Sequence, residues 1–172
     1  MPVEIERVFL LRGLPDPMPA GQVWRIEQGY LPPAAGEVGV LEGRLRRIVH
    51  TDGTIEHVHT VKTGLGMVRQ EVERTLDAAA FEREWPRTAG RRLEKVRTRI
   101  AQGDRTWEID RFLSLPVVLA ECELPSPDAD LPIPAWLAPW IEREVTHEPA
   151  FRNSELARRA GMLPGDTMFP LP

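Results

Sequence analysis

Several features that mark particular classes of protein are missing from this sequence. It has one cysteine, Cys122, which excludes an internal disulfide. No apolar run approaches the roughly 20 residues that a membrane-spanning helix needs, and the first residues carry neither the basic nor the apolar stretch of a signal peptide. These absences predict a cytoplasmic protein that has no role in a membrane.

Basic residues are too few for a general nucleic-acid binder. The 172 residues include 22 Lys and Arg against 26 Asp and Glu, a formal net charge of -4. Nucleic-acid binding normally needs an excess of positive charge over one face. The length and the 42% hydrophobic content fit one globular domain with a sizeable core. We predict a single domain over residues 1–160 and a flexible tail over residues 161–172.

Strand signals dominate what is present. Runs rich in β-branched and aromatic residues alternate with polar positions and end at turn residues such as Asp52-Gly53. The expected strands cover residues 3–11, 23–31, 40–50, 54–63, 67–76, 92–101, 105–113 and 117–124. Eight such strands predict an α+β, mainly β fold, in which a closed or nearly closed antiparallel barrel carries a few flanking helices.

Three other segments are expected to be helices or turns. Residues 77–85 begin with an aspartate that can cap a helix, and Pro86 blocks its continuation. Residues 135–141 follow a proline-rich stretch and predict a short helix or turn whose tryptophans pack on the barrel. Asn153 is expected to cap a last helix, and Gly161 to end it.

Pairs of like charges, separated by one residue, recur along the predicted strands. Because alternate residues of a strand face the same side, both members of a pair point the same way. The acidic pairs are Glu4 with Glu6, Glu71 with Glu73, Glu108 with Asp110, and Glu121 with Glu123. The basic set contains Arg44, Arg46, Lys62, Lys95 and Arg97, to which Arg69 and Arg99 can be added.

These charges have two interpretations. Any single pair is adequately explained as the solvated outer face of an amphipathic sheet, with opposite charges facing each other across strands. The signs are sorted by strand, however, and Glu121 and Glu123 lie in an otherwise apolar segment. Clustered carboxylates suit Mg²⁺ or Mn²⁺, whereas arginine forks suit phosphate oxygens. The combination indicates a site for metal-bound polyphosphate.

A series of short runs in order resembles the CYTH superfamily, the triphosphate tunnel metalloenzymes. These runs lie at residues 4–7, 27–31, 60–62, 69–73, 95–97, 107–110, 121–124, 143–146 and 151–156. Members of the superfamily include inorganic triphosphatases, thiamine triphosphatases and class IV adenylate cyclases. The resemblance implies an eight-stranded β-tunnel whose interior binds a triphosphate together with one or two divalent metal ions.

The resemblance also implies roles for individual residues. The phosphate-binding set is Arg44, Arg46, Lys62, Lys95 and Arg97. The metal set is Asp110, Glu121 and Glu123, with Glu4 and Glu6 serving a second metal or its waters. The remaining tunnel lining is Glu71, Glu73, Glu108 and Arg69.

One position departs from the family pattern. The family motif is Glu-x-Glu-x-Lys, and Val8 occupies the lysine position here. Strand alternation sends Arg7 to the opposite face, so Arg7 can replace the lysine only through a bulge. Arg69 is the other candidate for this role.

The function implied is metal-dependent hydrolysis of a small-molecule triphosphate, with inorganic triphosphate first and a small organic triphosphate second. Two alternatives stay open. One is a class IV-type adenylate cyclase, and the other, suggested by Val8, is a noncatalytic binder of polyphosphate or a phosphorylated metabolite.

Other reactive residues are less indicative of function. His57 and His59 share a strand face, but no carboxylate or cysteine lies at the spacing of a zinc site. Cys122 faces away from Glu121 and Glu123, which disfavours a nucleophilic role. A homodimer is left open.

Overall fold

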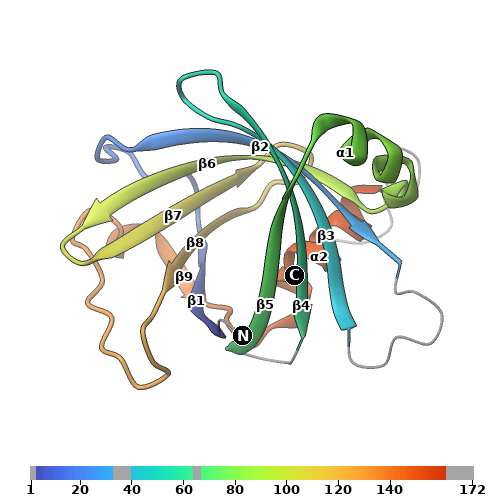
Figure 1. The fold of residues 1–172 in the computed structure, drawn as a ribbon. Coiled ribbons are helices and arrows are strands. Elements are labelled where there is room, and N and C mark those ends of the chain that lie inside the picture. The colour runs from blue at the N-terminus through green and yellow to red at the C-terminus, as the bar shows by residue number, and fades with distance from the viewer. Residues whose placement is uncertain (1–2, 33–39, 64–66, 162–172) are drawn as a thin grey trace.

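A computed structural model describes residues 3–32, 40–63 and 67–161, which form a β-barrel with two short helices (Figure 1). The strands are β1 (Val3–Leu11), β2 (Gln22–Leu31), β3 (Val40–Val49), β4 (Ile55–Thr63), β5 (Val68–Leu76), β6 (Arg92–Gln102), β7 (Arg105–Phe112), β8 (Val118–Glu123) and β9 (Ile141–Glu144). All pairings are antiparallel, in the order β5-β4-β3-β2-β6-β7-β8-β1-β9. The predicted mainly β barrel is therefore confirmed.

The barrel closes between β1 and β5, and this seam is short. Only Val3 to Ile5 of β1 pair with β5, whereas Phe9 to Leu11 pair along β1 with β9. Strands β5 and β9 thus follow one another beside β1, while β8 pairs with its other edge. The chain that follows β9 therefore continues beside β1, where the Val145 amide donates to the Val8 carbonyl.

The eight predicted strands agree with β1 to β8 to within about two residues at each end, as expected for boundaries read from sequence. The turn at Asp52-Gly53 has the expected chemistry, because Gly53 adopts a φ angle of +85°. Gly103, in the turn between β6 and β7, also has a positive φ angle, +62°. Strand β9 was not predicted. Its four residues are mostly charged, and its pairing depends on a tertiary contact with β1 that no local pattern announces.

The helices agree with the sequence in position. They are α1 (Ala78–Glu84), α2 (Asn153–Gly161) and the 3-10 turns η1 (Trp85–Thr88), η2 (Ala138–Trp140) and η3 (Pro149–Phe151). Asp77 caps α1, since its carboxylate accepts a hydrogen bond of 2.7 Å from the Ala80 amide. No helix among the described residues is long and apolar enough to cross a membrane. The predicted tail falls almost entirely outside the described residues.

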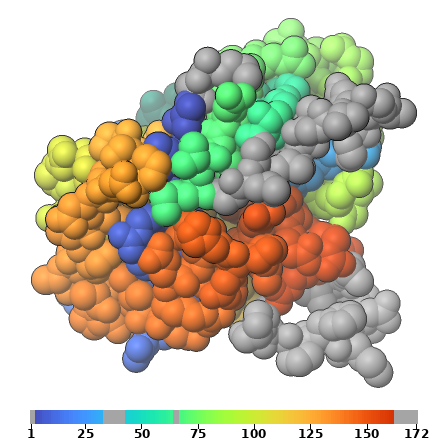
Figure 2. Space-filling view, turned by 90° about the horizontal axis from the view of Figure 1, so that it is seen from below, coloured from blue at the N-terminus to red at the C-terminus, as the bar shows by residue number. Residues whose placement is uncertain are grey.

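Two apolar clusters fix the position of the barrel interior. One packs the outer faces of β1, β6, β7 and β8 against the segment after β8, with Trp107 and Leu137 fully buried. The other joins inward residues such as Tyr30 and Phe112 to Phe151 and Leu156 near α2. Seen from below, the segment after β8, coloured orange to red, covers much of this face (Figure 2). The cluster around Phe151 and Leu156 lies at one part of the barrel interior, and mostly polar side chains line the cavity in the rest.

Candidate active site

The barrel encloses a charged cavity of about 300 Å³. Each of the eight barrel strands contributes to its wall, and the segment after β9 contributes Val145, Thr146, Glu148, Phe151, Arg152 and Asn153. Alternation along the strands places the charges there. On β6, for example, Arg97 and Arg99 line the cavity, and Arg97 lies opposite Asp110 of β7 in the strand register.

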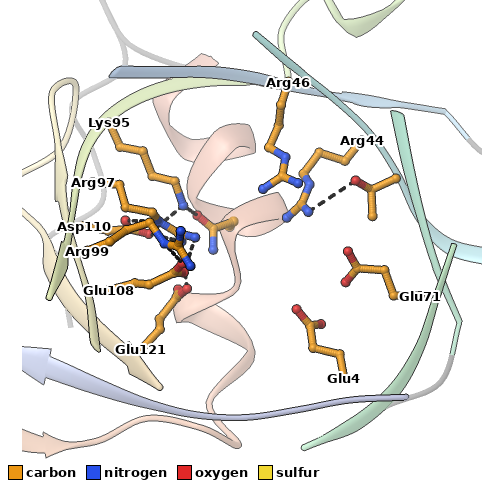
Figure 3. Close-up of polar contacts among 12 residues, drawn as sticks. Glu4, Arg44, Arg46, Glu71, Lys95, Arg97, Arg99, Glu108, Asp110 and Glu121 are labelled. Carbon is orange, nitrogen blue, oxygen red and sulfur yellow. Dashed lines mark hydrogen bonds and ion pairs between the residues drawn. The ribbon is translucent and has the colours of Figure 1, made fainter. Parts of the chain in front are cut away.

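All the predicted site residues except Lys95 and Asp110 line this cavity. The lining members are Glu4, Glu6, Arg44, Arg46, Lys62, Arg69, Glu71, Glu73, Arg97, Glu108, Glu121 and Glu123. Figure 3 shows Arg44 and Arg46 reaching in from one side, Glu4 and Glu71 from another, and the group around Arg97 from a third. Lys95 and Asp110 lie behind Arg97, at 2% and 0% exposure.

Arg97 is the centre of a buried ion-pair network. Its Nε and Nη2 atoms donate to the two oxygens of Asp110 at 2.7 Å each, and Nη2 also donates to Glu121 Oε2 at 2.9 Å. Its Nη1 contacts Glu108. Bidentate pairing fixes the plane of the guanidinium group. The network therefore holds Arg97 rigidly at the cavity wall.

Asp110 is enclosed by its two cationic neighbours. Lys95 Nζ lies 2.6 Å from Asp110 Oδ2 and also donates to Asn153 Oδ1 at 3.0 Å. Burial alone would raise the pKa of Asp110, but Arg97 and Lys95 attract the carboxylate and lower its pKa below the usual range. Burial lowers the pKa of Lys95 despite that pairing. Asp110 is thus an ionised carboxylate that orients two cations.

The opposite wall contains further ion pairs, whose carboxylates are less deeply buried than Asp110. Lys62 Nζ lies 2.6 Å from Glu4 Oε2 and 3.1 Å from Glu71 Oε2. Arg69 of β5 donates to Glu6 at 2.7 Å across the barrel seam. These carboxylates keep about a fifth of their side-chain surface exposed, 22% for Glu4 and 19% for Glu6. They can therefore exchange a partner for a bound ligand.

The arginines on β3 repel one another. Arg44 is buried and donates a long bond of 3.4 Å to Thr60, and Arg46 pairs with Glu73 at 2.7 Å. Burial, together with the positive charges of Arg44 and Arg97, lowers the pKa of Arg46 to about 10. An anion bound between these arginines would relieve the repulsion.

The carboxylates repel one another as well. Burial raises the pKa of Glu6 to about 7, with further contributions from Glu121 and Glu4. Burial also raises the pKa of Glu123, assisted by Glu4 and two other cavity glutamates. A cation bound among these side chains would relieve the repulsion. The cavity thus has one part that favours an anion and another that favours a cation.

The raised pKa of Glu6 leads to a test by pH. Between about 4.5 and about 7 the folded protein holds a proton on Glu6 that the unfolded chain has released. The free energy of unfolding of metal-free protein should therefore fall as pH rises through this window. Glu6→Gln should remove that part of the slope, measured by urea denaturation at several pH values in chelator. Glu142→Gln on β9 is the control and should keep the wild-type slope. If Glu6→Gln also keeps that slope, the pH dependence of stability does not come from Glu6.

The structure shows where Arg7 and Arg69, the two candidates for the role of the missing lysine at position 8, lie. Val8 lines the cavity beside Glu6, as alternation predicts. Arg7 points to the outer face and pairs with Glu144 of β9 at 2.7 Å, without a bulge at this position. The suggestion that a bulge brings Arg7 inward is therefore wrong. Arg69 does lie in the cavity, where its side chain donates to Glu6.

Several cavity residues were missed by the sequence analysis. Trp24 and Tyr30 come from β2, and Arg152 and Asn153 come from the start of α2. The alternation of β2 could have indicated the first two. The C-terminal pair had no such signal, because residues 145–153 run through a turn and a 3-10 helix rather than a periodic element.

The other reactive side chains lie apart from this site. The His57 ring lies tilted against Phe81, with ring centroids 4.6 Å apart, and His59 Nδ1 accepts a hydrogen bond from Arg74. Cys122 is buried in the outer cluster, and burial raises the pKa of its thiol to about 11. A thiol with that pKa is a poor nucleophile near neutral pH.

Comparison with known proteins identifies close relatives. The inorganic triphosphatase of Nitrosomonas europaea is 37% identical over 161 residues, which span 90% of this chain and 96% of the relative. The inorganic triphosphatase of Acetivibrio thermocellus is 40% identical over 68 residues, 38% of this chain and 41% of that protein. None of the protein-family models searched matches the chain.

Solved structures share the same fold. The crystal structure of the inorganic triphosphatase NE1496 superimposes with a TM-score of 0.59 at 35% identity, covering 94% of this chain and all of that one. The PH1819 protein of Pyrococcus horikoshii has a TM-score of 0.52 at 17% identity, covering 73% of this chain and 80% of its own. At that identity the second likeness concerns the fold alone.

Proposed function

The chain belongs to the CYTH superfamily of triphosphate tunnel metalloenzymes, and on this premise we propose that it is a metal-dependent hydrolase of inorganic triphosphate. The observation that carries the proposal is the division of one 300 Å³ cavity between mutually repelling arginines and mutually repelling carboxylates. A triphosphate with a bound divalent cation offers the complementary charges to both parts. Carboxylates alone would repel such a polyanion, so the metal ion is an essential component of the proposal.

The phosphate oxygens are assigned to the cations of the cavity. Arg44, Arg46, Lys62 and Arg97 line the wall and place positive charge beside a bound phosphate. Asp110 occupies the fork of Arg97, so a bidentate contact with phosphate is left to Arg44 and Arg46. Lys95 lies behind Arg97 and is held by Asp110 and Asn153. It can support the positive charge of the site, and reaches the substrate only by leaving one of these partners.

A divalent cation fits the donors on the carboxylate side. Glu4, Glu6, Glu121 and Glu123 offer the oxygen ligands that Mg²⁺ or Mn²⁺ prefers. Among the described residues no three potential ligands stand together as a preformed cluster. Mg²⁺ usually binds one or two carboxylates and completes its shell with water and substrate phosphate, so the proposal does not require a preformed cluster. Asp110 would have to exchange Lys95 or Arg97 to act as a ligand.

The proposed reaction needs no side-chain nucleophile. A water molecule oriented by a cavity carboxylate attacks the terminal phosphorus, the bond to the bridging oxygen breaks, and orthophosphate and pyrophosphate leave. The arginines stabilise the charge on the phosphoryl oxygens. They can do so effectively because they are held in place before the reaction begins. The bound metal ion supplies additional charge neutralisation.

The proposal is tested by turnover of a substrate panel. Purified protein should release phosphate from inorganic triphosphate with Mg²⁺ or Mn²⁺, at a higher kcat/KM than from ATP or thiamine triphosphate. Release of pyrophosphate and a cyclic nucleotide from ATP would instead identify a cyclase. Tight binding of every triphosphate without turnover would identify a noncatalytic binder, the alternative that Val8 suggests.

Binding of the anion is expected to depend on the metal ion. Five carboxylates of the predicted metal set, Glu4, Glu6, Asp110, Glu121 and Glu123, would otherwise face or lie near the triphosphate. Titration calorimetry should show tight binding of inorganic triphosphate with Mg²⁺ or Mn²⁺ and weak binding in excess chelator. Equal affinity under the two conditions would contradict the assignment of these carboxylates to a metal ion.

A further inference from the structure

We propose that Arg152, the residue directly before α2, binds substrate phosphate in the part of the cavity wall where β1 presents the apolar side chain of Val8. The inference rests on the proposed function and adds a substrate-contacting residue to it. It is drawn from the path of the chain after β9 and from the pairing of the cavity cations.

The segment after β9 is fixed alongside position 8. The Val145 amide donates to the Val8 carbonyl at 2.8 Å, and the Val8 amide donates to Thr146 Oγ1 at 3.0 Å. The Val8 side chain packs against the apolar cluster that contains Val145 and Phe151. This part of the cavity wall therefore has an apolar surface on β1, and the segment leading to Arg152 runs directly beside it.

Arg152 is anchored where it enters the cavity. It follows the buried Phe151, its amide donates to the Pro149 carbonyl at 3.1 Å, and its carbonyl accepts from the Leu156 amide at 2.9 Å. Its side chain lines the cavity. The backbone thus holds the residue immediately before α2 and leaves the guanidinium group to reach the interior.

No described residue neutralises the charge of Arg152. Five other cavity cations pair with carboxylates: Arg46 with Glu73, Lys62 with Glu4, Arg69 with Glu6, Arg97 with Asp110 and Arg99 with Glu108. Within residues 3–32, 40–63 and 67–161, the Arg152 side chain has no hydrogen-bond or ion-pair partner. A phosphate oxygen can therefore bind it without displacing a carboxylate.

The neighbour of Arg152 connects this position to the main cation group. Asn153 Oδ1 accepts a hydrogen bond of 3.0 Å from Lys95, which also contacts Asp110. The start of α2 is thereby tied to the network that holds Arg97. Arg152 lies at the edge of the proposed phosphate site rather than in a separate pocket.

The test compares Arg152→Gln with wild type, using inorganic triphosphate and Mg²⁺. Loss of a charged contact should lower kcat/KM by about tenfold to a hundredfold and weaken binding measured by calorimetry to a similar extent. Arg152→Lys should keep part of the affinity, because it keeps the charge but not the fork. Thermal unfolding should be unchanged, since the side chain has no partner to lose among the described residues.

Arg158→Gln is the matched control. Arg158 lies on α2, which begins directly after Arg152, and its replacement removes the same charge, but it is exposed outside the cavity, where it pairs with Glu155. The variant should leave kcat/KM and affinity at wild-type values. An equal loss in Arg158→Gln would assign the effect to the general charge of α2 and overturn the inference.

The second arm is a rescue from β1. Val8→Lys in the Arg152→Gln background should recover roughly tenfold or more of the lost affinity, whereas Val8→Lys alone should give little gain. Wild-type affinity in Arg152→Gln, or failure of a folded double variant to recover, would overturn the inference. Binding without turnover by wild type would contradict only the proposed hydrolysis, because the affinities still test Arg152.

Discussion

Arg97→Met is expected to lower the free energy of unfolding by about 3–5 kcal/mol, the typical cost of breaking a buried ion pair. The substitution keeps much of the side-chain volume but removes the partner of Asp110, Glu108 and Glu121. Asp110 is fully buried, so water cannot replace the lost charge. Urea denaturation of metal-free protein measures the change.

Arg25→Met provides the comparison for that result. Arg25 pairs with Glu94 at 2.9 Å on the outside of the barrel, and its side chain is 63% exposed. Exposed ion pairs contribute little to stability, so the free energy of unfolding should hardly change. Similar losses in the two variants would mean that the Arg97 network is not the buried structural unit described above.

Glu123→Gln is expected to reduce turnover of inorganic triphosphate by about a hundredfold or more, because it removes a ligand charge at nearly constant shape. Glu123 has no cationic hydrogen-bond partner among the described residues, and its pKa is raised by burial and neighbouring carboxylates. Replacing it should relieve repulsion in the metal-free protein. Its melting temperature should therefore stay the same or rise while activity is lost.

Glu142→Gln on β9 is the control for Glu123→Gln. Glu142 lies outside the cavity and pairs with Arg143 at 3.2 Å. It should retain wild-type turnover at every Mg²⁺ concentration. Full activity of Glu123→Gln, with the same Mg²⁺ dependence as wild type, would remove Glu123 from the proposed metal site.

Most of the barrel could be predicted because its strands have strong local signals. Alternation determines which side chains face inward, so the amino-acid sequence alone places charged pairs such as Arg44 with Arg46 on one face. The turn at Gly53 and the cap at Asp77 depend on local backbone chemistry. These features need no knowledge of distant contacts.

The remaining features depend on tertiary contacts. Strand β9 exists because β5 leaves part of β1 unpaired, and Arg152 reaches the cavity because the chain after β9 is fixed beside Val8. Asp110 illustrates the same limit. Its position on the inner face followed from alternation, but its enclosure by Lys95 and Arg97 depends on register across two strands and on burial.

The pairing of Asp110 changes how the predicted metal set is ranked. Glu4, Glu6, Glu121 and Glu123 line the cavity, whereas Asp110 lies behind Arg97 with both oxygens engaged. We therefore place the four glutamates ahead of Asp110 as candidates for direct metal contact. Substitution of Asp110 should disturb the orientation of Arg97 as well as any metal ion.

Hydrolysis of inorganic triphosphate within this cavity can be followed by ³¹P NMR of the substrate incubated with purified protein and Mg²⁺. We expect the triphosphate resonances to disappear, and pyrophosphate and orthophosphate to appear in equal amounts. Excess chelator should stop the conversion. Triphosphate that disappears no faster with folded protein and Mg²⁺ than in a protein-free sample would contradict the proposed hydrolysis.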